Sequence, residues 1–371
     1  MEKKIGIITF HRAHNFGAML QAFALQQFLS INNEAEILDY RSKCIENYYY
    51  SPLRLKSMIK SVILGRDSIS KLSLKIRRKK TFEKFQQKYL VCSQPYSSNN
   101  ISEASKNYDL FITGSDQVWN ASMVQDDLNY FLKFVNPENR FSYAASFGNN
   151  SILTYPAKEE MTELISTIKI PLIRENDGVE ILKKLNATNY ARAKVVCDPV
   201  FLLTKCEWEE KLGLKKKSSD YIFAFFVNDP IHSLDIAKSL HEKTGLSVKY
   251  CHSYGTEKNI PDWCEKLMDI GPRKFMETLN SAKYVVTTSF HGMALSIRLG
   301  KQFYYELNKN GTNSRLNTLA EIFDLHDREI TDSNIPTCSE IDYQKVNEVL
   351  EKYSSYSKAV LLSSLEGIDY E

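Results

Sequence analysis

The residues best suited to chemistry stand where predicted strands end. His291 lies between a β-branched, apolar run at 284–288, typical of a buried strand, and a short apolar helix predicted around 293–299. Parallel sheets bind ligands at the carboxyl ends of their strands, and the free N–H groups that begin a helix attract anions. A histidine at this junction can contact a phosphate or carboxylate and can also donate a proton. The alternative is that His291 only caps a turn.

Arg174 is a second such residue, because it ends a short strand predicted at 170–174. A guanidinium there suits two-pronged binding of a phosphate or a carboxylate. The alternative is a salt bridge to Glu175 or Asp177.

Two polar loops follow other predicted strands. The strand at 108–113 leads into the loop 114–120, which carries Asp116 and a tryptophan, Trp119, suited to wall a pocket. The stretch 140–148 repeats this arrangement of a strand and a small polar loop.

The first strand-to-helix junction carries Asn15 and Gly17, at the place where a Rossmann-like fold binds its ligand. The chain has no GxGxxG motif there, so a dinucleotide is not indicated. The alternative for Gly17 is that it only lets the helix start close to the sheet.

The elements that must position these residues form two successive α/β halves. The chain opens with a strand at 5–10, a helix at 17–29 and a strand at 36–40, and a new β-α-β run begins at 221–227. We therefore predict an α/β protein with two Rossmann-like domains that face each other across a cleft. The predicted boundaries are 1–214, with a basic helical insertion at about 48–92, then 215–330 after a linker at 215–219, and a helical tail at 331–371.

The composition is that of an ordinary globular protein, with 43% hydrophobic and 25% charged residues. The net charge of +3 is too small to argue for nucleic acid. Seven cysteines without CxxC spacing suggest neither a zinc site nor a disulfide framework. The N-terminal apolar run is too short for a signal peptide, and no run approaches the ~20 apolar residues of a membrane span. We expect a reduced, cytoplasmic protein without a metal.

The insertion is strongly basic. Its run at 71–88 interleaves lysines and arginines with Leu72, Leu74, Ile76, Phe82 and Phe85. A basic amphipathic helix can lie on an anionic membrane surface. The alternative is a solvated helical insertion.

Taken together and in order, these motifs resemble the polysaccharide pyruvyl transferase family. Each stretch alone is weak, but the ordered set is specific and covers roughly residues 4–325. The matching stretches are Asn15–Ala18, Leu20–Ala22, Gly114–Asn120, Ser142–Gly148, Arg174–Glu175, Asp198–Pro199, Ser289–Gly292 and Asn313–Arg315.

The resemblance implies a fold like that of the GT-B glycosyltransferases, and we expect the C-terminal helix to pack back on the first domain. It also implies transfer of pyruvate from phosphoenolpyruvate to a sugar hydroxyl, as an enol ether or a cyclic ketal, in the precursor of a capsule or exopolysaccharide. Phosphoenolpyruvate is then a co-substrate, and no cofactor is required.

By the same resemblance, Arg174 and His291 contact phosphoenolpyruvate, together with Ser289 and Gly292. Some members have an arginine where Ser289 stands, so another cation must share the trianion. The candidates are, in this order, Arg315, Arg298 and Lys301.

The residue types fit this chemistry. Adding a hydroxyl across the donor's double bond needs an acid for the methylene carbon and a base for the hydroxyl. His291 is the candidate acid, for that carbon or for the departing phosphate, and Asp116 is the candidate base. The acceptor is expected on residues of the first half, namely Asn15, Gly17, Ser115, Gln117, Trp119 and Ser146.

The expected acceptor is a sugar, carried on a lipid-linked oligosaccharide if the basic helix contacts the inner membrane surface. Two other functions stay open. One is a GT-B glycosyltransferase that uses a nucleotide sugar, because fold alone does not fix function. The other is a non-catalytic glycan-binding protein.

Overall fold

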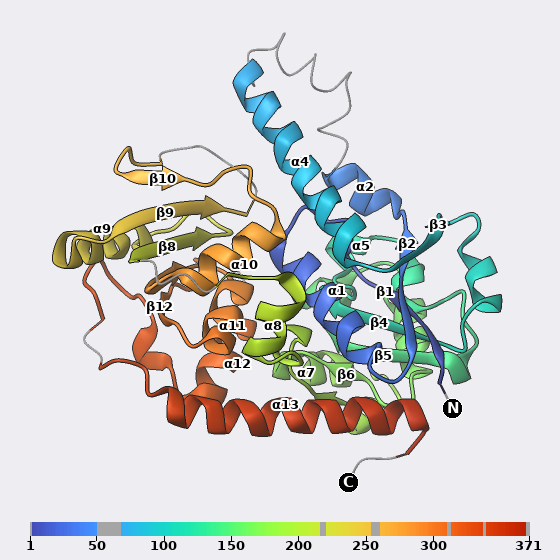
Figure 1. Cartoon of the computed structure of the whole chain (residues 1–371). Coiled ribbons are helices and arrows are strands. Elements are labelled where there is room, and N and C mark those ends of the chain that lie inside the picture. Colours follow the sequence, from blue (N-terminus) through green and yellow to red (C-terminus); the bar gives the residue numbers. More distant parts are fainter. Residues whose placement is uncertain are drawn as a thin grey trace.

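A computed structural model of the chain describes residues 2–49, 68–215, 220–253, 260–309, 313–336 and 339–368. The predicted linker falls largely on 216–219, and part of the predicted insertion on 50–67, both outside the described residues. The described chain is an α/β protein with two parallel sheets, each flanked by helices (Figure 1).

The first sheet has the strand order β3-β2-β1-β4-β5-β6-β7, and every described strand pair in it is parallel. Its strands are β1 (Lys4–Ile8), β2 (Glu34–Tyr40), β3 (Cys92–Tyr96), β4 (Leu110–Asp116), β5 (Arg140–Ala145), β6 (Leu172–Ile173) and β7 (Lys194–Val195). The helices of this half are α1 (Phe16–Leu29), α2 (Lys43–Tyr49), α4 (Ile69–Tyr89), α5 (Ala121–Val124), α6 (Lys158–Ser166) and α7 (Asn176–Lys184).

The second sheet has the order β10-β9-β8-β11-β12 and is also parallel. Its strands are β8 (Tyr221–Phe226), β9 (Ser247–His252), β10 (Cys264–Lys266), β11 (Tyr284–Thr287) and β12 (Gln302–Tyr305). The remaining helices are α8 (Lys205–Leu212), α9 (Ser233–Thr244), α10 (Pro272–Ser281), α11 (Phe290–Leu299), α12 (Ser314–Phe323) and α13 (Tyr343–Glu366).

Both sheets change direction of winding beside their first strand. In the first sheet β1 lies between β2 and β4, and in the second β8 lies between β9 and β11. The crossover helices on either side of such a point lie on opposite faces of the sheet, which leaves a crevice at the carboxyl ends of the two central strands. The order of strands therefore fixes one ligand-binding crevice in each half.

The sequence analysis did not predict the edge strands β3 and β10. β3 contains Pro95, and its residues are mostly polar, while β10 is only three residues long. Short, polar or proline-containing strands are tolerated at sheet edges, where one side has no ladder to complete. They therefore lack the apolar run that marked the buried central strands.

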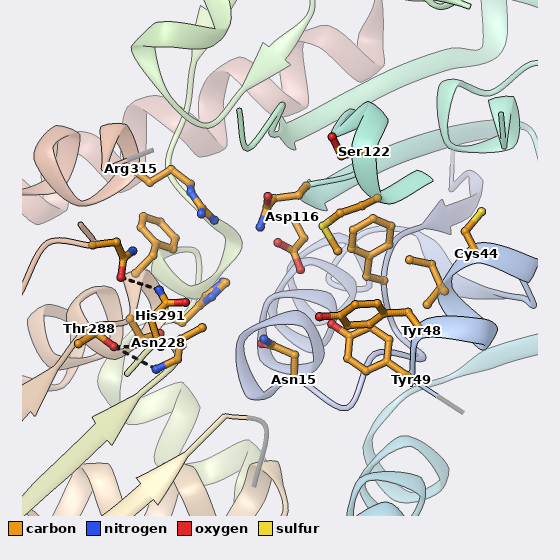
Figure 2. A pocket seen from close by; sticks show the side chains of 18 of the residues that line it. Asn15, Cys44, Tyr48, Tyr49, Asp116, Ser122, Asn228, Thr288, His291 and Arg315 are labelled. Atoms are coloured by element: carbon orange, nitrogen blue, oxygen red, sulfur yellow. Dashed lines mark hydrogen bonds between the residues drawn. The ribbon is translucent and has the colours of Figure 1, made fainter. Parts of the chain in front are cut away.

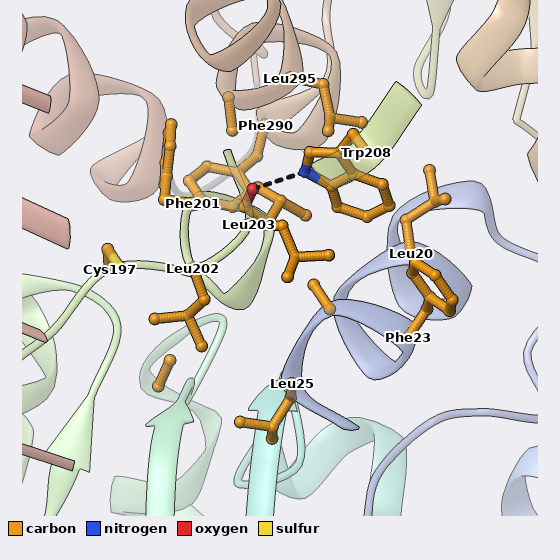
Figure 3. Close-up of a cluster of buried hydrophobic side chains, with 14 of the residues drawn as sticks. Leu20, Phe23, Leu25, Cys197, Phe201, Leu202, Leu203, Trp208, Phe290 and Leu295 are labelled. Atoms are coloured by element: carbon orange, nitrogen blue, oxygen red, sulfur yellow. Dashed lines mark hydrogen bonds between the residues drawn. The ribbon is translucent and has the colours of Figure 1, made fainter. Parts of the chain in front are cut away.

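One apolar cluster joins the two halves (Figure 3). Leu20 and Phe23 of α1 pack there against the segment 199–203, Trp208 of α8 and Leu295 of α11. The indole N–H of Trp208 donates to the Val200 carbonyl at 3.1 Å, so its only polar group is satisfied. The halves therefore share a core.

Helix α13 packs back across both halves, which confirms the expectation for the C-terminal helix. At its start, the Tyr343 hydroxyl donates to the Ser296 carbonyl of α11 at 3.2 Å. Further along, the Ser357 hydroxyl accepts from the backbone N–H of Cys197 at 2.9 Å, and the Leu365 carbonyl accepts from Lys3 at 2.6 Å. In Figure 1 the helix (red) underlies both halves.

Helix α4 lies partly between the halves and partly free of them. Phe82, Phe85 and Arg78 are its buried side chains. The Arg78 guanidinium donates to the carbonyls of Met268 and Ser253 in the second half. The N-terminal end of the helix stands clear of both sheets in Figure 1, and Ile69 there is exposed. Among the described residues, no helix is long and apolar enough to span a bilayer.

Candidate active site

A cavity of about 300 Å³ lies between the two crevices. This volume is at the lower end of the range for small-molecule sites. Asn15 follows β1 and Asp116 ends β4, and on the opposite side Asn228 follows β8 and Ser289 follows β11. Figure 2 shows Asn228 on one side of the cavity and Asn15 and Asp116 on the other. The predicted cleft between two Rossmann-like halves is therefore present, and each half contributes the carboxyl ends of its central strands.

The N-terminus of α11 carries His291 as predicted. Ser289 is the N-cap, since its hydroxyl accepts from the Gly292 N–H at 3.3 Å. Ser289, and not His291, therefore caps this helix. His291 sits in the first helical turn and lines the cavity. Gly292 lets this turn lie against β11, because a Cβ there would be 2.3 Å from the Thr287 hydroxyl oxygen.

Gly17 makes room for the His291 ring. A Cβ at position 17 would stand 2.0 Å from His291 Nδ1, far inside any allowed contact. The expected reason for this glycine was an acceptor contact or a close approach of α1 to its own sheet. The structure instead brings the first turn of α1 against the imidazole from the other half. An acceptor contact at Gly17 stays a prediction.

Asp198 is the group around which the charged residues gather. Its carboxylate lies 2.9 Å from Nη1 of Arg174 and 3.5 Å from Nε2 of His291. The side chain is fully buried. Burial favours the protonated acid, but His291 and Arg174 outweigh it and hold the pKa of Asp198 well below its usual range. The side chain thus joins a residue of the first half to one of the second.

Arg174 is surrounded by carboxylates. Besides Asp198, Glu175 lies 3.6 Å from its Nε and Asp116 lies 3.7 Å from its Nη2. Burial lowers the pKa of Arg174, but these three carboxylates outweigh burial and raise it. The alternative reading of a salt bridge to Glu175 is thus realised, although Asp198 is the closer partner. Among the described residues, Nε and Nη2 of Arg174 have no hydrogen-bond acceptor, so part of the guanidinium's donor capacity is unused.

Arg315 is the cation that faces the cavity. No hydrogen bond or ion pair to its guanidinium is found among the described residues. Its Cζ lies 5.9 Å from the centre of the Phe290 ring, and the Cζ of Arg174 lies 4.9 Å from the same ring. Burial, and then the charge of Arg174, lower the pKa of Arg315. Arg315 is the first of the three predicted substitutes for an arginine at Ser289.

The other two candidates lie elsewhere. The Arg298 guanidinium donates to the Phe201 carbonyl, within the core that joins the halves. Lys301 follows the end of α11, where burial lowers its pKa to about 8. Neither residue lines the cavity.

Asp116 ends β4 and lines the cavity, as its predicted role as a base requires. Its backbone is left-handed, with φ 71°, a conformation that aspartate tolerates better than most residues. Asn15 and Gln117 also line the cavity. Asn15 is the N-cap of α1, and its Nδ2 is 3.4 Å from the Ser253 hydroxyl of the second half.

Three predicted acceptor residues point away from the cavity. Trp119 is 0% exposed; in the core it stacks with Phe131 and packs against Phe147, so a tryptophan in a polar loop is a misleading signal. The Ser115 hydroxyl donates to the Ala144 carbonyl at 2.8 Å, and the Ser146 hydroxyl donates to Glu175 at 2.6 Å. Both serines support the strand ends rather than line the cavity.

Sequence reasoning missed several residues of the site. Asp198 was noted only as part of a motif, although its place after β7 put it at the same sheet edge as Arg174. Tyr48 and Tyr49, on α2, line the cavity opposite Arg315 (Figure 2). In the sequence these two tyrosines stand at the start of the predicted basic insertion, and their spacing does not indicate a site. Within the described part of the chain, no cluster of three or more histidine, cysteine, aspartate or glutamate side chains has metal-site geometry.

Comparisons with known proteins agree with this architecture. A family model described as polysaccharide pyruvyl transferase matches residues 15–310. The sequence has no match among curated proteins.

Two solved structures illustrate the fold. UDP-GlcNAc 2-epimerase from Neisseria meningitidis, solved with bound UDP-GlcNAc, has a TM-score of 0.50 at 10% identity, covering 99% of this chain and 100% of the other. An α-glucosyltransferase solved with UDP and DNA has a TM-score of 0.53 at 13% identity, with coverage of 99% and 100%. At these identities the likeness concerns the fold alone, and it confirms the predicted GT-B-like class.

Gly17→Ala should disturb the site through His291. Alone, we expect it to destabilise the protein by about 1–3 kcal/mol, because the added methyl group overlaps the imidazole. In a His291→Ala background the same substitution should be neutral or stabilising, since alanine is the better helix former. Urea unfolding of the four proteins measures this coupling. Additive effects would show that the ring and Gly17 do not constrain each other.

Asp198→Asn should lower the free energy of unfolding at pH 7 by about 3–5 kcal/mol, as breaking a buried ion pair does. Because the folded-state pKa is depressed, the carboxylate's contribution is complete above its unfolded-state pKa of about 4 and declines below it. The difference from wild type in urea unfolding should therefore shrink between pH 5 and pH 3. Asp262→Asn, an exposed control, should change little. A difference that widens on acidification would contradict the assignment.

Proposed function

Because the chain belongs to the polysaccharide pyruvyl transferase family, we propose that it transfers a pyruvyl group from phosphoenolpyruvate to a sugar hydroxyl in the precursor of a cell-surface polysaccharide. The observation that carries the proposal is the Arg315 guanidinium, which lines the cavity with no ion-pair partner among the described residues, beside His291 at a helix N-terminus. A small anion is the ligand that this pair of groups suits.

Phosphoenolpyruvate carries a phosphate and a carboxylate, and the site offers a partner for each. Arg315 can bind one anionic group with two parallel N–H donors. The backbone of the first turn of α11 and the His291 side chain can bind the other. Arg174 does not line the cavity, but it holds Asp198, which lies 3.5 Å from His291, so a direct contact of Arg174 with the donor stays a prediction. In this proposal Ser289 borders the donor at the helix N-terminus, whereas the missing side chain of Gly292 faces Thr287, so a donor contact at Gly292 stays a prediction.

The transfer then needs one acid and one base. Asp116 accepts the proton of a sugar hydroxyl, and the sugar oxygen bonds to C2 of the donor. His291 supplies a proton either to the methylene carbon, which becomes a methyl group, or to the phosphate. For a cyclic ketal, a second hydroxyl of the same sugar bonds to C2 as the C2–O bond to phosphate breaks. Of the two hydroxyl protons, one ends on the methyl group and one on inorganic phosphate.

A nucleotide-sugar donor is the competing proposal, and the hydrogen bonds of the Glu306 carboxylate disfavour it. A second pocket of about 310 Å³ adjoins the first and includes Glu306 and Ile231. Glu306 already accepts from the N–H groups of Ile231, His232 and Ser233 at the start of α9, and from the Ser233 hydroxyl at 2.6 Å. A diphosphate would have to displace this carboxylate to use that helix N-terminus.

The reaction itself is tested by mass spectrometry. The protein is incubated with phosphoenolpyruvate and a panel of nitrophenyl and lipid-linked glycosides. The proposal predicts a pyruvate-sized addition to at least one acceptor, with release of one phosphate per transfer. Sugar transfer from a UDP- or GDP-sugar to the same panel, without any pyruvyl product, would support the glycosyltransferase instead. Ligand binding without turnover on any acceptor would support a glycan-binding protein.

Arg315→Lys should weaken the binding of phosphoenolpyruvate by about 2–3 kcal/mol, because an ammonium does not reproduce the planar fork. Titration calorimetry measures the loss. Arg273→Lys is the matched control, since Arg273 binds the carbonyls of Leu212 and Gly213 away from the cavity. Equal affinities for wild type and Arg315→Lys would remove Arg315 from the donor site.

His291→Gln should act on the rate more than on binding. Glutamine keeps a hydrogen-bond donor but supplies no acidic proton, so turnover should fall by about 10²–10⁴-fold while donor affinity changes much less. Steady-state kinetics together with calorimetry separate the two effects. A variant that loses donor binding but keeps its maximal rate would make His291 an anion ligand and not the acid.

We also propose that α4 contacts the anionic inner membrane surface that would carry a lipid-linked acceptor. The proposal is supported by its exposed lysines, Lys71, Lys80, Lys84 and Lys88, and by the free N-terminal end of the helix. Co-sedimentation with phosphatidylglycerol vesicles should fall with salt and be absent with phosphatidylcholine. Replacing Lys80 and Lys84 by glutamate should weaken the co-sedimentation, whereas replacing Lys183 and Lys184 on α7 by glutamate should not. If sedimentation is absent or does not depend on salt, the proposal is contradicted and α4 is a solvated helix.

A further inference from the structure

The cavity has two chemically different ends. Arg315 and His291 lie at one end, and Tyr48 and Tyr49 of α2 lie at the other, with Asp116 between them in Figure 2. The proposed donor needs only the cationic end. The chemistry of the donor therefore gives the aromatic end of the cavity no role.

The two tyrosines present a broad aromatic surface to the cavity. Their ring centres are 4.8 Å apart and the rings are inclined at 74°, an edge-to-face pair. Tyr48 is 62% exposed, which is unusual for so large an aromatic side chain. Ile45 and Met123 extend the apolar surface beside it. A ligand that covers this surface would remove from water an aromatic face that the protein itself leaves uncovered.

Helix α2 is held in place at the carboxyl ends of β1 and β2. Glu46 of α2 pairs with Arg12, which also lies 3.3 Å from Asp39 at the end of β2. The Nε2 atom of His11 lies 3.3 Å from the same oxygen of Asp39, Oδ1. These mutually paired, partly buried polar groups fix the helix against the loop that follows β1.

A second contact ties α2 to the loop that carries Asp116. The thiol of Cys44 donates to the Val124 carbonyl of α5 at 3.1 Å, and α5 begins four residues after the Asp116-Gln117 pair. The aromatic surface and the proposed base therefore belong to one rigid unit. A ring bound on the tyrosines would keep a fixed position relative to the Asp116 carboxylate.

We infer that Tyr48 and Tyr49, with Met123, form the acceptor subsite and take the apolar face of a pyranose ring. The inference rests on the proposed function. A pyranose has an apolar C–H face and a rim of hydroxyls, so it needs an aromatic surface bordered by hydrogen-bonding groups. Asn15, Gln117 and Gln125 supply that border. A ring stacked on the tyrosines turns one edge of hydroxyls toward Asp116 and the bound donor.

The test uses saturation-transfer NMR on the full chain. The probes are the methyl glycosides of glucose, galactose, mannose and N-acetylglucosamine, each added in the presence of phosphoenolpyruvate. We expect at least one of them to receive saturation from the wild-type protein. Tyr48→Ala should weaken its binding about tenfold, as removal of a central aromatic contact does, and Tyr48→Phe should retain it. Tyr190→Ala, at an exposed tyrosine outside the cavity, is the control and should change nothing.

Phosphoenolpyruvate calorimetry on the same variants separates this inference from the proposed function. Unchanged donor affinity in Tyr48→Ala, with weakened glycoside binding, supports two subsites. Absence of donor binding by the wild type would contradict the proposed function itself. If the donor binds but no glycoside does, or if Tyr48→Ala binds glycosides as the wild type does, the aromatic subsite is refuted. Loss of both ligands together would also contradict it.

Discussion

The Asp198 carboxylate is the interaction on which the candidate site depends. It is completely buried, and an isolated buried carboxylate is too costly to persist in ionised form. It is held by Arg174, from the first half, and by His291, from the second. The positions of both side chains are therefore tied to one carboxylate oxygen, Asp198 Oδ2, at the junction of the halves, and His291 borders the cavity. The apolar core around the segment 199–203 fixes Asp198 itself.

The charges of this cluster limit what the cavity can bind. Arg174 and Arg315 carry two positive charges, while Asp116, Glu175 and Asp198 carry three negative ones when all are ionised. A trianionic donor adds further negative charge. Its binding is therefore favoured by the partial positive charge at the start of α11. His291, in the first turn of that helix, is also the proposed acid, so donor binding and the acid step concern the same end of the cavity.

The sequence predicted the parts of this site that obey local rules. A strand followed by a turn and a helix put His291 at a helix N-terminus, and Asp116 likewise ended a recognisable strand. The two halves and the helical tail followed from apolar periodicity. Arg315 came from the family motif, because no periodicity distinguishes it from other helical arginines.

The remaining features arise from contacts between segments far apart in the chain. Gly17 reads as a helix-start glycine, and only the packing of α1 on α11 shows that its missing Cβ accommodates His291. Trp119 follows a polar strand end but turns into the core, which no local pattern reveals. Tyr48 and Tyr49 enter the cavity because α2 folds over α5. Edge strands β3 and β10 form because each pairs with a neighbouring strand, and this pairing cannot be predicted from a local sequence pattern.

The central claim is that the cavity between the two halves holds a small anion with a phosphate and a carboxylate. Titration calorimetry of phosphoenolpyruvate and of UDP-GlcNAc into the wild-type protein, at the same pH and ionic strength, tests it most directly. We expect saturable binding of phosphoenolpyruvate and none of UDP-GlcNAc over the same concentration range. Saturable binding of UDP-GlcNAc with no heat from phosphoenolpyruvate would contradict it.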